Sequence, residues 1–222
     1  LYPRLRRKAG PKSDRLLGPI IAKADVEPQL RQRWLERLWR ALQDDEMPYI
    51  ELLGDYWGEL CVTPALASDW ADAFLPLAEQ AWSPAAPEHE FFKGTSACLA
   101  CLYAAGRDQE VLVLLDTAPF KWWHYRRWGV KSLVALGKKA EAIQYAEDSR
   151  GLNDRGWQIS QACEAILLSS GSFEEAYRRY ALEANQATTH LARFRSIAGK
   201  YPYKTPEEIL RDLMASTPGA EG

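Results

Sequence analysis

The chain has 222 residues, of which 47% are hydrophobic and 26% are charged, a composition typical of a soluble globular protein. The longest aliphatic run, at residues 111–115, is far too short to cross a bilayer. Four cysteines are too few for a disulfide scaffold, so we expect reduced thiols and a cytoplasmic protein.

The formal net charge of −2 hides an asymmetry along the chain. Residues 1–40 hold 11 lysines and arginines against 4 aspartates and glutamates, whereas the remainder holds 17 against 26. A basic N-terminal segment followed by an acidic remainder of the chain indicates one of two things. Either the segment binds an anionic partner, or it folds back on the acidic part of its own protein.

Residues 1–24 are predicted to form a basic, partly extended arm. Glycines and prolines recur from Pro3 to Pro19 and forbid a long helix. The basic side chains that could contact an anionic partner there are Arg4, Arg6, Arg7 and Lys8.

Residues 25–87 are predicted to form an N-terminal helical region. Apolar residues at helical spacing predict a helix over 28–42, with its arginines mostly on other faces. An aromatic-rich stretch over 48–61 fits a second helix. Thr63 and Pro64 fit the N-cap and first position of a third helix, which Pro76 should kink or split. The prolines of residues 83–87 predict a linker.

Residues 88–222 are predicted to be repeated helix pairs. Gly106, Gly137 and Gly171 lie 31 and 34 residues apart, the period of a helix-turn-helix solenoid. Glycine just past a helix end accepts the left-handed conformation, so each glycine should close a turn between two helices. Residues expected in the core are Leu102, Leu133, Leu167, Ala142 and Ala176. Residues 172–175 and 205–208 predict capping boxes.

The repeated block resembles tetratricopeptide repeats over residues 88–187. The turn glycine, Phe173 two residues after it in the third copy, Ala176 and Tyr180 carry the resemblance. The first half of each unit departs from the family, because Leu99, Val130 and Glu164 stand where a small residue belongs. Small residues lie one position earlier, at Cys98, Gly129 and Cys163, which predicts a shifted helix contact. The resemblance implies an all-α, right-handed superhelix of antiparallel helix pairs that binds a protein or peptide in its concave groove.

A weaker resemblance links residues 191–202 and 209–213 to helical-repeat regions of uncharacterised bacterial proteins, some of which bear a SWIM-type zinc finger. The cysteine–histidine motif of that finger is absent from this sequence. The resemblance therefore implies no zinc site, and we predict no cofactor.

The stretch from Lys121 to Trp128 combines three tryptophans with two arginines. Such side chains are frequent binding anchors, so we expect partner-binding residues at Tyr103, Trp123, Arg126 and Arg127. The competing interpretation is that the tryptophans fill gaps between repeats and the arginines pair with acidic side chains.

Two other classes of function stay open. A nucleic-acid-binding protein would use Arg4, Arg6, Arg7, Lys8, Arg33 and Arg37, although the isoelectric point near 6.0 is unlike that of a dedicated nucleic-acid domain. An enzyme would need His124 or Cys98 beside a carboxylate in a pocket. Cys98 and Cys101 form a CxxC within a predicted helix, with no second pair of ligands for zinc, so we predict no catalytic residue.

Overall fold

The computed structural model describes residues 18, 20–45, 50–83, 92–151 and 156–216, and every regular element in these ranges is helical. The protein is therefore all-α. The chain divides into two compact units, residues 1–120 and residues 121–222, which are described separately. Among the described helices, none combines the length and apolar character needed to cross a membrane.

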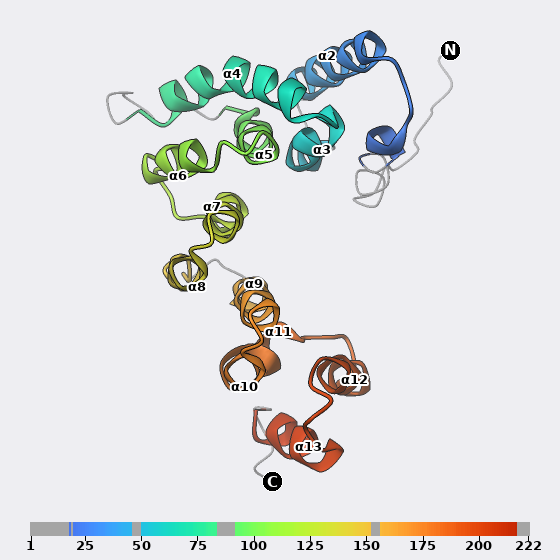
Figure 1. Ribbon diagram of the computed structural model, residues 1–222, viewed down its shortest axis with the longest axis vertical. Coiled ribbons are helices and arrows are strands. Elements are labelled where there is room, and N and C mark those ends of the chain that lie inside the picture. Colours follow the sequence, from blue (N-terminus) through green and yellow to red (C-terminus); the bar gives the residue numbers. More distant parts are fainter. Residues whose placement is uncertain (1–17, 19, 46–49, 84–91, 152–155, 217–222) are drawn as a thin grey trace, which may run out of the picture. The chain divides into compact units, whose positions relative to one another are not determined.

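In the described part of the first unit, residues 20–23 form a short helical turn. The elements that follow are α2 (Pro28–Asp44), the 3₁₀ helix η1 (Glu51–Tyr56), α3 (Trp57–Cys61), α4 (Pro64–Ala81), α5 (Thr95–Ala104) and α6 (Asp108–Asp116) (Figure 1). The predicted cap of α4 is confirmed, because the Thr63 hydroxyl accepts a 3.3 Å hydrogen bond from the Leu66 amide. The helix continues through Pro76 and is not split. The predicted linker lies largely outside the described residues.

Aromatic rings fill the centre of the first unit. Trp57 is fully buried, and its ring lies 5.5 Å from that of Trp70 and 6.1 Å from that of Phe74. Next to it, α3 and α5 approach at backbone distance: a Cβ on Gly58 would lie 2.3 Å from the Ala100 carbonyl oxygen. Only glycine fits at this crossing.

The second unit continues the series of helices (Figure 1). Its elements are α7 (Trp123–Ala135), α8 (Lys139–Glu147), α9 (Gly156–Ser169), α10 (Phe173–Ala176), the π-helical turn η2 (Tyr177–Ala181), α11 (Leu182–Ala184), α12 (His190–Lys200) and α13 (Pro206–Ala215). The segments α10, η2 and α11 follow one another without a break and pack against α9.

The three turn glycines are confirmed. Gly106, Gly137 and Gly171 have φ values of 73°, 77° and 75°. In each turn the amide after the glycine donates to the carbonyl of the leucine four residues before the glycine, at 2.9, 2.8 and 3.0 Å. This is the hydrogen-bond pattern of a Schellman C-cap. The leucines and alanines predicted for the core are buried.

The two predicted capping boxes have different outcomes. Thr205 and Glu208 form one, with reciprocal hydrogen bonds of 3.2 and 2.8 Å. The box predicted at residues 172–175 is wrong, because the Ser172 side chain makes no cap hydrogen bond. Ser172 also closes the preceding turn, which holds its ψ at 56°, whereas an N-cap needs extended backbone.

A close helix contact occurs at one of the shifted small positions, Gly129. A Cβ on this residue would lie 2.7 Å from the Tyr145 ring. Glycine therefore lets the aromatic ring of α8 pack directly on the backbone of α7.

Candidate functional site

Two of the residues expected to bind a partner, Trp123 and Arg126, lie in the interior of the second unit. The Arg126 guanidinium donates to the Ser149 hydroxyl at 2.6 Å and stacks 3.5 Å from the centre of the Tyr145 ring. These contacts join α7 to the end of α8. Both side chains therefore stabilise the unit rather than contribute to its exposed surface, and Trp122 is the exposed tryptophan instead, at 49%.

The other two expected partner-binding residues are half-buried. Arg127 donates from its Nε atom to the His124 carbonyl at 2.9 Å. Tyr103 belongs to α5 of the first unit, whereas Arg127 belongs to the second. The structure therefore does not define a single site that contains all four predicted residues.

Of the residues expected to contact nucleic acid, the structure describes two. Arg4, Arg6, Arg7 and Lys8 lie outside the described residues. Arg33 and Arg37 are exposed on α2.

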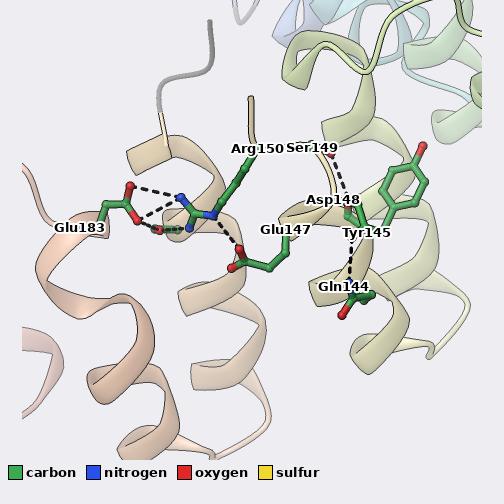
Figure 2. Close-up of polar contacts among 8 residues, drawn as sticks. Gln144, Tyr145, Glu147, Asp148, Ser149, Arg150 and Glu183 are labelled. Carbon is green, nitrogen blue, oxygen red and sulfur yellow. Dashed lines mark hydrogen bonds and ion pairs between the residues drawn. The ribbon is translucent and has the colours of Figure 1, made fainter. Parts of the chain in front are cut away.

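One polar network of the second unit centres on Arg150, just after α8 (Figure 2). Its guanidinium contacts Glu147 at 2.6 Å and Glu183 at 3.2 Å. It also donates to the Ser160 hydroxyl at 2.7 Å, and that hydroxyl donates to Glu183 at 2.6 Å. The network therefore fastens α8, α9 and α11 together.

The backbone of α9 leaves room for this network at Gly156. A Cβ there would lie 2.4 Å from the Glu183 carboxylate and 3.0 Å from the Arg150 guanidinium. A larger residue would push the two charged groups out of their present geometry.

A second network surrounds Glu164, whose exposed fraction is only 1%. The carboxylate accepts hydrogen bonds from Asn185 at 2.7 Å, Tyr201 at 2.7 Å and Lys200 at 2.6 Å. Three donors compensate the burial of the charge. Because these donors follow α11 or lie at the end of α12, the carboxylate joins three parts of the unit.

The Arg150 network favours the ionised form of the Glu147 carboxylate. Burial tends to raise the pKa of Glu147, but the hydrogen bond and positive charge of Arg150 lower it, so that the pKa lies below its usual range. Glu183 accepts a hydrogen bond from the Ser160 hydroxyl and pairs with Arg150. Through these contacts the network joins α11 to α9 and to the end of α8.

The cysteines are equally inert. All four are free and buried. Burial raises the pKa of the Cys98 thiol to about 12 and that of Cys163 to about 11. The thiols of Cys98 and Cys163 therefore stay protonated at neutral pH, and a protonated thiol is unreactive because the thiolate is the reactive form.

No metal centre emerges in the described ranges. No group of three or more histidine, cysteine, aspartate or glutamate side chains there could hold a metal ion. His124 is half-buried, with its ring 4.9 Å from that of Tyr125.

The polar networks around Glu164 and around Arg150 and Ser160 were not among the sequence predictions. One signal was present: Glu164 occupies a small-residue position of the repeat, directly between Cys163 and Ala165. An acidic residue at a core position needs buried donors, which the sequence alone could not locate.

Comparisons with family models, with curated proteins and with solved structures find no significant match to this chain. The fold and its networks define a class: an all-α protein of helix hairpins closed by glycine turns. Its function is therefore argued from its own surface and interior.

Proposed function

We propose that the protein is a non-enzymatic, tetratricopeptide-like scaffold that binds another protein or a peptide. The observation that carries the proposal is the threefold recurrence of one turn, with a left-handed glycine and the same hydrogen bond to a buried leucine. Helix hairpins repeated in this way stack into a right-handed superhelix, whose extended surface suits protein recognition.

The interior supports this proposal. The Arg126, Arg150 and Glu164 networks use their polar groups to hold helices together. Burial raises the pKa of the Cys98 and Cys163 thiols above its usual value. These groups therefore contribute rigidity, as a scaffold requires, and the cytoplasm is the compartment in which four free thiols stay reduced.

Affinity capture from a nuclease-treated extract of the source cells tests the proposal. The scaffold predicts a protein partner that is retained after nuclease treatment and weakened by Tyr103→Ser or Arg127→Gln, the two expected anchors that are half-buried and not fully enclosed. A matched control is Arg178→Gln, at an exposed arginine of the same unit as Arg127.

Capture that disappears with nuclease would contradict the scaffold and favour nucleic-acid binding. Capture that is unchanged by both variants would leave the scaffold standing but move its surface away from Tyr103 and Arg127.

A further inference from the structure

Helix α2 carries arginines of two kinds. Arg31 points inward and is buried. Its guanidinium donates to the carbonyls of Ile21 at 3.1 Å, Ala24 at 2.5 Å and Leu60 at 3.2 Å. Arg31 therefore fastens the chain before α2, and the start of the helix itself, to the end of α3.

The other arginines of the helix form an outward stripe, which we define as Arg33, Arg37 and Arg40. Spacings of four and three residues place them along one face. All three are exposed. Where the structure describes the chain, the stripe makes no hydrogen bond or ion pair, unlike Arg107, which salt-bridges Asp72 and Glu110.

A cleft lies beside the stripe. It has a volume of about 410 Å³ and is lined by Ile21, Trp34, Arg37 and Leu38. Arg37 belongs to both the stripe and the cleft, so a cation lies beside the apolar side chains of Ile21 and Leu38 and the Trp34 ring. Because Arg31 holds the Ile21 carbonyl, one wall of the cleft is fixed to the core.

We infer that α2 binds a short acidic segment of a partner protein, with one apolar side chain in the cleft and carboxylates on the stripe. The inference rests on the proposed function and names its partner chemistry. Guanidinium groups bind carboxylates in bidentate pairs. An apolar side chain in the cleft supplies the anchor that charge pairs at an exposed surface lack.

The dimensions favour an acidic peptide over nucleic acid. From Arg33 to Arg40 the stripe spans eight residues of helix, a length of about 10 Å at the α-helical rise. This length suits a short peptide segment but only a few phosphates of a nucleic acid. Affinity for nucleic acid depends on the number of phosphates neutralised. Beyond residue 40 the chain holds 26 acidic against 17 basic residues, and this excess repels a long polyanion more than a short peptide.

The test uses the full 222-residue chain and a displayed library of random dodecapeptides. Peptides selected on the wild-type protein are labelled, and their binding is titrated by fluorescence anisotropy. The stripe variant is Arg33→Gln/Arg37→Gln/Arg40→Gln. The matched control, Arg178→Gln/Arg195→Gln/Arg211→Gln, removes the same charge from exposed positions of the second unit.

The inference predicts peptides rich in aspartate and glutamate around an apolar residue. The stripe variant should weaken their binding about 10- to 50-fold, as expected for three charge pairs, and the control triple by less than about twofold. Replacing the apolar residue of the peptide by alanine should weaken binding to the wild type without altering the protein's fold.

Three results would overturn the inference. Selected peptides that bind the stripe variant as tightly as the wild type would leave the scaffold standing but remove α2 from it. A labelled dodecathymidylate that binds tighter than every selected peptide, and depends on the stripe, would assign the surface to nucleic acid. The absence of any enriched peptide would contradict both the inference and the proposed function.

Discussion

The two units of the protein are stabilised by different interactions. In the first unit, aromatic rings surround Trp57, with separations of 5.5–6.2 Å to Trp39, Trp70 and Phe74. In the second unit, polar networks around Glu164 and Arg150 join successive helices. One unit therefore depends mainly on apolar packing at its centre, and the other adds directional, charge-dependent contacts.

The two units should therefore respond differently to substitutions in their interiors. Apolar packing is non-directional and depends on filled volume. A buried polar network depends on every partner, because a single deletion leaves buried groups unsatisfied. Volume changes should therefore damage the first unit most, and isolated charge deletions the second.

The largest expected effect is at Trp57. Trp57→Ala should lower the free energy of unfolding by about 4 kcal/mol, because it opens a cavity among three aromatic rings. Chemical denaturation followed by circular dichroism measures the change. Trp122→Ala removes the same side chain from a half-exposed position and should change stability by less than about 1 kcal/mol. Equal losses in both variants would contradict the aromatic centre.

A substitution at Glu164 tests the contribution of its polar network to the stability of the second unit. Glu164→Ala should lower the free energy of unfolding by about 3 kcal/mol, because Asn185 and the Tyr201 hydroxyl lose a buried acceptor. The same denaturation measurement applies. The control is Glu174→Ala, since this exposed carboxylate lies 3.7 Å from Lys204 and should contribute less than about 1 kcal/mol. A loss at Glu164 no larger than that of the control would show that the network is not stabilising.

A substitution at Gly58 tests the backbone packing of α3 against α5 in the first unit. Gly58→Ala places a methyl group against the Ala100 carbonyl and should cost about 2 kcal/mol or more. Gly199→Ala is the control within α12, where no atom lies within 4 Å of the added methyl. That change should be neutral or stabilising by up to about 1 kcal/mol, because alanine favours a helix over glycine. Thermal unfolding that ranks the two variants in the opposite order would refute the close approach of α3 and α5.

The smallest effect concerns pH and Arg150. The pKa of Glu147 lies below its ordinary value of 4.5, so its stabilising interaction is complete above about pH 4.5 and is lost as the pH falls through the folded-state pKa. Arg150→Gln should cost about 1 kcal/mol at pH 7, and the difference from wild type should shrink by pH 3.5. Denaturation at both values measures it, with Arg178→Gln as the control. A difference independent of pH would exclude the ionised network as its origin.

The glycine turns could be predicted from the sequence because their cause is local. A left-handed residue at a helix end favours glycine, and the leucine that accepts the turn's hydrogen bond lies only four residues away. The prediction of a capping box at Ser172 is wrong for an equally local reason. Ser172 belongs to the turn that ends the preceding helix, and the backbone conformation of that turn is not the extended one that an N-cap residue needs.

The networks could not be predicted, since their partners lie far apart in the sequence. Glu164 is separated from Lys200 by 36 residues and from Tyr201 by 37. The burial of Arg126 depends on where Tyr145 of the next helix lies. The exposure of Arg33 and Arg37, by contrast, follows from helical spacing alone.

The central functional claim is that α2 recognises an acidic segment of a partner. Hydrogen–deuterium exchange of the full chain, with and without a peptide selected from the library, locates the contact directly. Binding at α2 should slow exchange in residues 20–24 and 28–44 and leave the second unit unchanged. Slowed exchange confined to other helices, with α2 unaffected at saturating peptide, would contradict it.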